Sequence, residues 1–116
     1  MTIAYERWQG SMAEAAEPLL ALCRSVFPDF SDAYLLERLP RVADPMLWLA
    51  IEQGRWTGFK LGYRRGADLF YSWLGGVASA ARGQGVGSEL MRLQHAAALL
   101  TATASSRPAP APPTTR

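Results

Sequence analysis

A glycine-rich segment over residues 82–88, Arg-Gly-Gln-Gly-Val-Gly-Ser, is the part of the sequence best suited to bind an anion. Three glycines, Gly83, Gly85 and Gly87, allow backbone conformations that bring several N–H groups toward one point. The apolar pattern that follows predicts a helix over residues 89–100, whose positive N-terminal end would face the same point. We therefore expect this segment to hold a phosphate or pyrophosphate group.

Two common phosphate-binding motifs do not fit this segment. A Walker A loop ends in Gly-Lys-Ser/Thr, whereas Gly87 is followed by Ser88 and Glu89. The dinucleotide fingerprint needs the spacing G-x-G-x-x-G, and no set of these glycines provides it. A glycine-rich turn that merely joins a strand to a helix is the simpler alternative, but such a turn needs one flexible residue rather than three and an arginine.

The spacing R/Q-x-x-G-x-G/A does fit, with Arg82, Gly85 and Gly87. In this pattern, and in its place between an apolar strand and an amphipathic helix, the sequence resembles the pyrophosphate loop of the GCN5-related N-acetyltransferases, abbreviated GNAT. The resemblance covers roughly residues 2–100. It implies transfer of an acetyl group from acetyl-CoA, used as a co-substrate, to a primary amine on a small molecule or a protein.

The resemblance also implies how the co-substrate would be held. Backbone N–H groups of the loop would bind the pyrophosphate, Arg82 would add a positive charge, and the pantetheine amides would pair with the strand end at Val77 and Gly75. A strand N–H near Leu74 would polarise the thioester carbonyl. The cofactor-binding residues expected on this basis are Val77, Arg82, Gly83, Gln84, Gly85, Val86, Gly87 and Ser88.

No catalytic acid or base stands out in the sequence. A base must take the proton from an acceptor ammonium, and the candidates are Glu37, Glu52 and Asp68, none of which lies in a motif. The alternative for each is a solvated surface carboxylate. In the resembled family a tyrosine beyond the loop helix often protonates the leaving thiolate; that segment is not found here, and Tyr71 is expected to pack in the sheet instead.

The strands that position the loop are predicted from alternating apolar residues. Three of them precede residue 66, over residues 2–8, 46–53 and 56–65. A hairpin turn at Gly54-Arg55, with glycine in the left-handed conformation, would join the second to the third. The strand before the loop, 69–77, is apolar on both faces, so we expect it to be central and covered on both sides. The pair Gly75-Gly76 predicts a bulge or a close approach at its end.

Two helices are expected between the first and second strands. Spacings of three and four residues predict one buried face, made of Ala13, Ala16, Leu20, Cys23 and Phe27. Pro18 would either start this helix, near Glu17, or kink it. Ser31 or Asp32 would cap a shorter helix that ends at Leu39. Together the elements predict an α/β fold with antiparallel strands and flanking helices, which corresponds to the N-terminal part of the GNAT fold.

Aromatic residues of the predicted strands could line an acceptor pocket, but core packing in a small sheet is the expected role of most of them. They are Trp48, Trp56, Phe70, Tyr71 and Trp73. The pair Arg64-Arg65 could meet the 3′-phosphate of CoA, although arginines at a hairpin end are usually solvated.

Composition indicates one domain and disfavours several functions. The chain has 116 residues, of which 49% are apolar, enough for a single core. A net charge of +2 with scattered basic residues does not favour nucleic acid as a partner. The N-terminus has no long apolar run, so neither a signal peptide nor a membrane span is expected. We expect a cytoplasmic location instead. With one cysteine, Cys23, and one histidine, His95, neither a disulfide nor a metal site is expected.

Residues 101–116 are rich in alanine, proline and threonine and are expected to form a disordered tail beside an incomplete domain over residues 1–100. We take as a hypothesis that a frame shift near residues 99–102 produced this tail, since a G+C-rich gene read out of frame gives such a mixture. Two alternatives to an acetyltransferase remain: an acyl-CoA-binding module without catalysis, and a frame-shifted remnant that acts only in protein interaction. An exposed sheet edge would also allow a homodimer.

Overall fold

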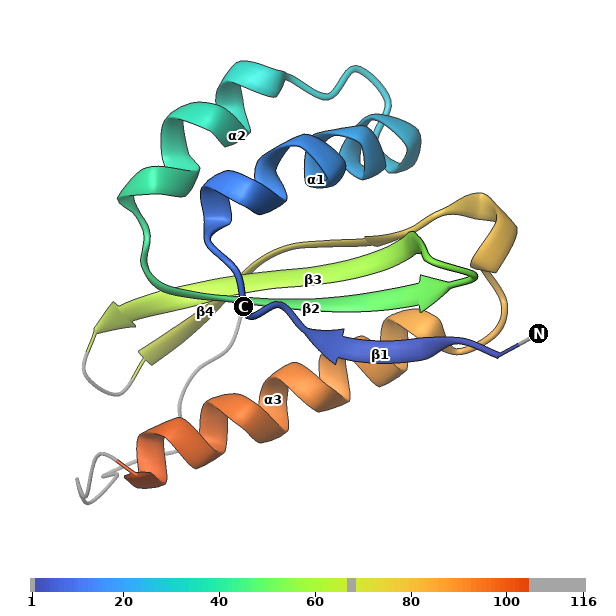
Figure 1. Cartoon of the computed structure of the whole chain (residues 1–116). Helices are drawn as coiled ribbons and strands as arrows, with labels where there is room; N and C mark the ends of the chain where they lie inside the picture. Colours follow the sequence, from blue (N-terminus) through green and yellow to red (C-terminus); the bar gives the residue numbers. More distant parts are fainter. Residues whose placement is uncertain (1, 67–68, 105–116) are drawn as a thin grey trace.

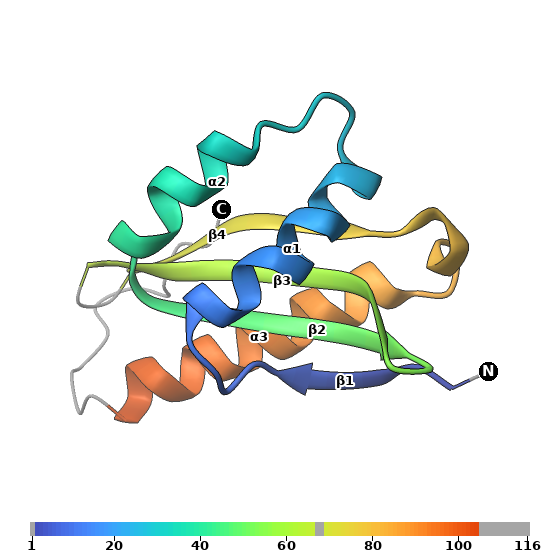
Figure 2. The same ribbon diagram turned by 45° about the horizontal axis from the view of Figure 1, so that its top comes forward.

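Figure 1 shows a computed structural model of the chain, which describes residues 2–66 and 69–104. Its elements in chain order are β1 (Ala4–Arg7), α1 (Met12–Val26), α2 (Asp32–Arg38), η1 (Leu39–Arg41), β2 (Ala43–Glu52), β3 (Arg55–Gly66), β4 (Leu69–Val77), η2 (Ser79–Ala81) and α3 (Val86–Ala104). The strands form one antiparallel sheet of order β1-β2-β3-β4. Helices α1 and α2 cover one face and α3 covers the other, as Figures 1 and 2 show. The expectations for Asp68 and for residues 105–116 of the predicted tail lie outside the described residues. Residues 101–104 were also expected to be disordered, but they continue α3 to Ala104, so the predicted boundary after Leu100 is wrong.

Helix α1 begins earlier than the sequence suggested. Ser11 Oγ accepts a hydrogen bond from the Glu14 N–H at 3.1 Å, and Glu14 Oε1 accepts one from the Ser11 N–H at 3.0 Å. This capping box satisfies backbone donors at the helix start, so the helix begins at Met12 and continues through the exposed Pro18. Of the two alternatives for Pro18, a helix start near Glu17 is therefore wrong, and Pro18 lies inside the helix as the other alternative required.

The buried face of α1 is also partly different from the predicted one. Leu20 and Cys23 are buried as expected, but Ala13 is exposed and Leu19 and Leu22 are buried in its place. The helix carries apolar residues at two overlapping sets of three-and-four spacings, and the position of the sheet beneath it selects one of them.

The β2–β3 hairpin turns at Gln53 and Gly54, one residue earlier than predicted. Both residues have positive φ, 52° and 77°, as the central residues of a type I′ turn require. The glycine in the left-handed conformation is confirmed. Glu52 and Arg55 pair directly across the turn.

Strand β4 lies at an edge of the sheet, because β3 is its only strand neighbour within the described residues. The prediction of a central strand is therefore wrong, whereas the exposed sheet edge that was also expected is found at this strand. The apolar residues on both of its faces have another cause, since α1 approaches one face and α3 the other. Every residue of β4 is nevertheless partly exposed.

A bulge in β4 centres on Trp73. Adjacent β3 residues Leu61 and Gly62 pair with Leu74 and Ser72, which leaves Trp73 as an extra residue. Trp73 and Leu74, although adjacent, consequently both pack against the core beneath α1 and α2.

The glycine pair at the end of β4 holds no bulge. Gly75 and Gly76 pair in regular register with Lys60 and Phe59, so the bulge predicted there is wrong. The close approach predicted there is confirmed: a Cβ on Gly76 would lie 2.5 Å from Val26 Cγ1. The strand end needs glycine because α1 packs tightly upon it.

Helix α3 begins at Val86, three residues before the predicted start at Glu89. Its first turns pack closely on the sheet at Gly58, where a Cβ would lie 3.0 Å from Val86 Cγ1 and 3.3 Å from Leu90 Cδ1. Val86 and Leu90 form a second small core with Ala50 and Ala81. This contact fixes the N-terminus of α3 beside the end of β4.

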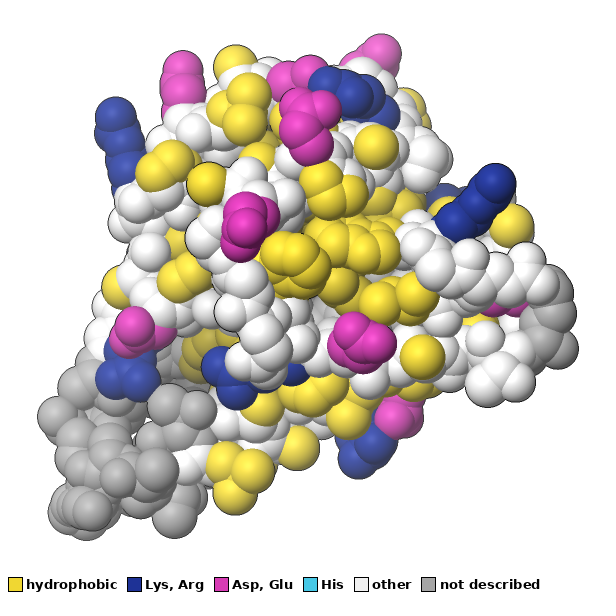
Figure 3. All heavy atoms as spheres, in the orientation of Figure 1, with side chains coloured by type: hydrophobic (Ala, Val, Ile, Leu, Met, Phe, Trp, Pro, Cys, Tyr) yellow, Lys and Arg dark blue, Asp and Glu magenta, His cyan; other side chains and the backbone are white. Residues whose placement is uncertain are grey.

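Charged side chains of both signs are interspersed on the face shown in Figure 3. Within the described range, no helix combines the length and the apolar character needed to cross a bilayer.

The free edge of β4 leads to a prediction about backbone exchange. In dilute solution the amides of Gly75 and Val77, which point away from β3, should exchange hydrogen faster than those of Gly76 and Ala78, which face it. Amide exchange by NMR measures this alternation. At higher concentration the same edge should promote self-association, detectable by light scattering. A monodisperse monomer with a sharp, high-temperature unfolding transition and uniform amide protection would contradict both expectations.

Candidate cofactor site

The loop between β4 and α3 presents backbone donors. Gly83 and Gly85 have positive φ, 83° and 73°, which lets the chain reverse sharply and enter the helix. The first hydrogen bond of α3 runs from the Glu89 N–H to the Gly85 carbonyl at 3.0 Å. The N–H groups of the first helical residues, Val86, Gly87 and Ser88, therefore have no intrahelical acceptor. Together with the positive end of the helix dipole, they suit an anion.

The space around this loop is open to a ligand. Among the described residues, no atom outside the chain neighbours lies within 4 Å of the position that a Cβ would take on Gly83 or Gly85. A Cβ on Gly87 would meet only Val77 Cγ2, at 3.7 Å. An anion can thus approach the backbone of the loop closely, which is the condition for a pyrophosphate site.

The end of β4 adds a second row of backbone groups beside the loop. The Ala78 N–H donates to the Thr57 carbonyl at 2.7 Å, so Ala78 faces β3. Because donors alternate along an antiparallel strand, Val77 and Gly75 direct their N–H and C=O groups outward, toward the free edge. The N–H and C=O groups of Gly75 and the N–H of Val77 can pair with the amides of an extended ligand, whereas the Val77 carbonyl accepts a hydrogen bond from Arg82.

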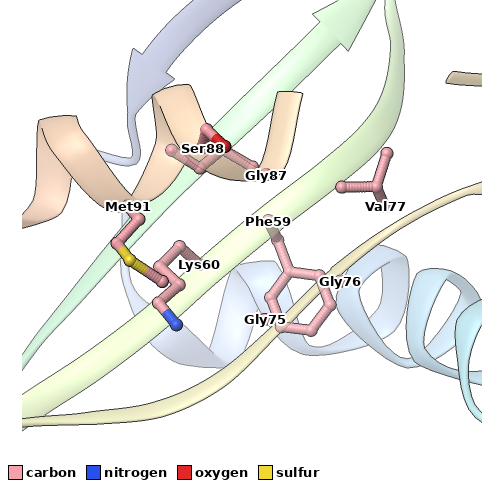
Figure 4. A pocket seen from close by; sticks show the side chains of 9 residues that line it. Phe59, Lys60, Gly75, Gly76, Val77, Gly87, Ser88 and Met91 are labelled. Atoms are coloured by element: carbon pink, nitrogen blue, oxygen red, sulfur yellow. The ribbon is translucent and has the colours of Figure 1, made fainter. Parts of the chain in front are cut away.

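Loop and strand end meet in one cavity of about 410 Å³ (Figure 4). It is lined by Phe59, Lys60, Gly75, Gly76, Val77, Gly87, Ser88, Leu90 and Met91. Three of the residues predicted to bind the cofactor, Val77, Gly87 and Ser88, line this cavity. Arg82, Gly83, Gln84 and Gly85 form the exposed loop that leads to it.

Arg82 has a partner that the sequence did not suggest. Its Nε donates a hydrogen bond to the Val77 carbonyl at 3.0 Å. The side chain thereby ties the loop to the strand end and leaves its terminal nitrogens available to solvent or a ligand.

Val86 also differs from its neighbours, since its side chain is buried in the core and only its backbone can face an anion.

Lys60 is a site residue that the sequence analysis missed. It is the only lysine of the chain and lies on β3 among apolar residues, which was the available signal. Its side chain crosses Gly75, where a Cβ would lie 2.9 Å from Lys60 Cδ and 3.4 Å from Nζ. Figure 4 shows the ammonium group at the cavity. Burial lowers the pKa of Lys60 below its ordinary value, because a charged ammonium is poorly solvated there.

The proposed bases are not brought to this cavity. Glu37 is exposed on α2, and Glu52 is buried at the end of β2, with its Oε2 lacking a hydrogen-bond partner among the described residues. Neither lines the cavity. His95 is exposed on α3, and Cys23 lies on the buried face of α1, as expected for the cysteine. Over residues 2–66 and 69–104, no three potential ligands of the His, Cys, Asp and Glu types are grouped to hold a metal ion.

No protein-family model matches the chain, and no curated protein matches it in sequence. Solved structures do match in shape. An aminoglycoside acetyltransferase from an uncultured soil metagenomic sample, solved with sisomicin, aligns with a TM-score of 0.67 at 18% identity over 86% of this chain and 72% of its own. An aminoglycoside 6′-N-acetyltransferase solved with coenzyme A aligns with a TM-score of 0.67 at 17% identity, over 87% of this chain and 57% of its own.

A third structure, a GNAT family acetyltransferase from Streptococcus pneumoniae TIGR4, gives a TM-score of 0.65 at 18% identity over 82% of this chain and 67% of its own. The chain thus spans between about half and three quarters of the length of these three neighbours. Identities of this size establish architecture, and the architecture is the one that the loop sequence predicts. The chain has the fold of the GCN5-related N-acetyltransferases.

Proposed function

We propose that the protein transfers an acetyl group from acetyl-CoA to a primary amine. One observation carries the proposal: the N–H groups at the start of α3, which have no acceptor within the helix, border the same cavity as the outward N–H and C=O of Gly75 and the outward N–H of Val77. The first set suits a pyrophosphate and the second suits the amides of a pantetheine arm. The shared fold supports the proposal, as does the coenzyme A bound to one structural neighbour.

Acetyl-CoA supplies the acetyl group as a thioester. The loop from Arg82 to Ser88 binds the pyrophosphate through backbone N–H groups, and Arg82 holds that loop against Val77. The outward edge at Gly75 orients the arm along β4. Lys60 adds positive charge beside the same edge, where low solvent access strengthens its attraction for an anion. The acceptor amine then attacks in its neutral form, after its proton passes to water or to a carboxylate.

Acyl-CoA binding without catalysis is the second candidate function. It is favoured by the positions of Glu37 and Glu52, neither of which lines the cavity. Turnover of acetyl-CoA with a panel of amines separates the two functions, since only an acetyltransferase releases free CoA in proportion to the amine consumed.

The role of the glycine-rich loop over residues 82–88 in CoA binding can be tested with a matched pair of glycine variants. Gly85→Val should abolish the thermal protection that CoA gives, because the added side chain blocks approach to the loop backbone. Gly54→Val is the control: Gly54 has a similar φ, 77° against 73°, and is equally open, but lies in the β2–β3 turn. Both variants should lose comparable stability, and only Gly85→Val should lose CoA binding in calorimetry. Equal CoA affinity in the two would show that the loop is not the site.

Arg82→Ala should weaken CoA binding by about 1 to 2 kcal/mol, roughly five- to thirtyfold in Kd. The variant loses one charge and the bond to the Val77 carbonyl, while the backbone donors remain. Arg7→Ala removes the same charge from the exposed surface of β1 and should leave the affinity unchanged. Isothermal titration of CoA into each protein measures the difference. An equal loss of CoA affinity in both variants would show that Arg82 contributes only through the net charge of the protein and not through a contact in the loop.

Lys60→Met should have opposite effects on stability and on binding. At neutral pH the folded state carries a poorly solvated ammonium, so the variant should unfold at a higher temperature. At a pH between the lowered pKa of Lys60 in the folded state and its ordinary pKa in the unfolded state, the unfolded chain binds more protons than the folded one. The wild type should therefore gain stability as pH rises through this window, and the difference in unfolding temperature between the variant and the wild type should shrink. CoA affinity at neutral pH should fall about three- to tenfold. Thermal unfolding between pH 7 and 10, with CoA titrations, tests both; a variant that is less stable and binds CoA normally would contradict them.

A further inference from the structure

A second hollow, of about 520 Å³, lies on the face of the sheet that α2 covers, between α2, η1 and the paired strands β3 and β4. Its aromatic wall consists of Tyr34 from α2, Tyr63 from β3, and Tyr71 and Trp73 from β4. Of these, Tyr71 and Trp73 were expected to serve core packing. Trp73 does contact the core, but both residues also line the hollow.

The aromatic wall is rigid because its rings hold one another in place. Tyr63 meets Tyr71 and Trp73 edge to face, with ring centroids 5.4 and 5.6 Å apart. Trp73 Nε1 donates a hydrogen bond to Tyr34 Oη at 2.9 Å, which also fixes the Trp73 ring. The wall presents a preformed surface for a flat apolar group, at little cost in side-chain entropy.

Four arginines surround this wall. The Arg38 guanidinium lies 4.3 Å from the ring centroid of Tyr34, and that of Arg65 lies 5.0 Å from that of Tyr71. Stacking on a ring orients a guanidinium and leaves its N–H groups free to bind a carboxylate or a phosphate at two points. Arg41 also lines the hollow, as does Arg64, whose Nε lies 3.2 Å from Asp44 Oδ2. The arginines expected to be merely solvated thus form part of a concave site.

The charge of this region favours an anionic ligand. Segments 38–44 and 63–73 carry four arginines and, as acidic residues, Asp44 and Asp68, which gives a net charge of +2. A polycationic amine would be repelled by such a surface. A ligand with a carboxylate or phosphate and a flat apolar body would match both the guanidinium groups and the rings.

The hollow is placed to present an acceptor to the cofactor site. Trp73 lines the hollow and Gly75 lines the cofactor cavity, two residues further along β4, which is about 7 Å. The two sites lie on opposite faces of the sheet, and they can meet around its free edge. An amine held by its anionic group among the arginines could therefore reach the strand end.

We propose that this hollow binds the acceptor, and that the acceptor is an amine carrying a carboxylate or a phosphate on an aromatic or similarly flat body. The identification as acceptor rests on the proposed acetyltransferase function; the binding of an anionic amine does not. In transfer, the neutral amine nitrogen forms a C–N bond to the acetyl carbonyl carbon and loses one proton, the C–S bond breaks, and the leaving thiolate takes up one proton, directly or through water.

Calorimetry on the full chain, with and without desulfo-CoA, tests the binding step. L-Phenylalanine supplies an amine, a ring and a carboxylate, whereas phenethylamine lacks only the carboxylate. Pyridoxamine 5′-phosphate and pyridoxamine form the corresponding phosphate pair, and spermidine represents a polycation. We expect at least tenfold tighter binding for one member that carries a carboxylate or phosphate than for its counterpart that lacks this group, and no binding of spermidine. The better of the two pairs identifies the anionic group.

A matched pair of arginine variants locates the site. Arg65→Gln should weaken binding of the preferred anionic amine about five- to tenfold. Arg55→Gln, an exposed arginine at the other end of the same strand, should leave it unchanged. Equal binding of the probes with and without an anionic group, preference for spermidine, or equal effects of the two variants would overturn the inference.

Turnover of acetyl-CoA then separates the two levels of the proposal. Anionic amines that bind and are acetylated support both. Anionic amines that bind at the hollow without acetylation, in a protein that binds CoA, keep the site and reject the acetyltransferase function. Acetylation of amines that lack an anionic group, polycations included, in preference to those that carry one keeps the function and rejects the anionic acceptor.

Discussion

The packing of α3 on Gly58 is the contact on which the proposed cofactor site depends. With no side chain at Gly58, Val86 and Leu90 approach the sheet closely enough that a Cβ there would be crowded at 3.0 Å. Gly58 pairs with Val77, so the helix start is held directly beside the strand end. Backbone donors of the loop and outward groups of β4 consequently face the same cavity. Without this contact the glycine-rich loop would be a flexible turn with no fixed partner.

Strand β4 connects the two sites of the molecule. Its bulge at Trp73 places two adjacent side chains, Trp73 and Leu74, on the face covered by α1 and α2. Beyond Leu74 the glycines Gly75 and Gly76 return to regular pairing with β3, and this part of the strand carries no side chains. One strand thus contributes an aromatic wall at its centre and bare backbone at its end. Because both lie along a free edge, ligands on opposite faces of the sheet can approach each other.

Positive charge is arranged differently in the two sites. In the cofactor cavity it comes mainly from backbone N–H groups and the helix dipole, assisted by Arg82 and by Lys60, whose pKa burial lowers. In the second hollow it comes from guanidinium groups, two of which stack on tyrosine rings. Lysine in a half-buried place is costly to ionise, whereas arginine stays charged and keeps its planar geometry on a ring. The types of residue therefore match the surroundings in which they are found.

The sequence by itself determined the elements and the loop, because their signals are local. Glycine spacing around Gly85, the three-and-four spacing of apolar residues in α1 and the alternation in β2 and β3 depend only on near neighbours along the chain. Tertiary structure decided what depends on partners distant in sequence: that β4 lies at an edge, that its bulge falls at Trp73, and that Lys60 crosses Gly75. Apolar residues on both faces of a strand indicate cover by helices, and they carry no information about which strands flank it. The gathering of arginines and rings in the second hollow likewise joins residues from α2, β3 and β4, whose proximity no local pattern could specify.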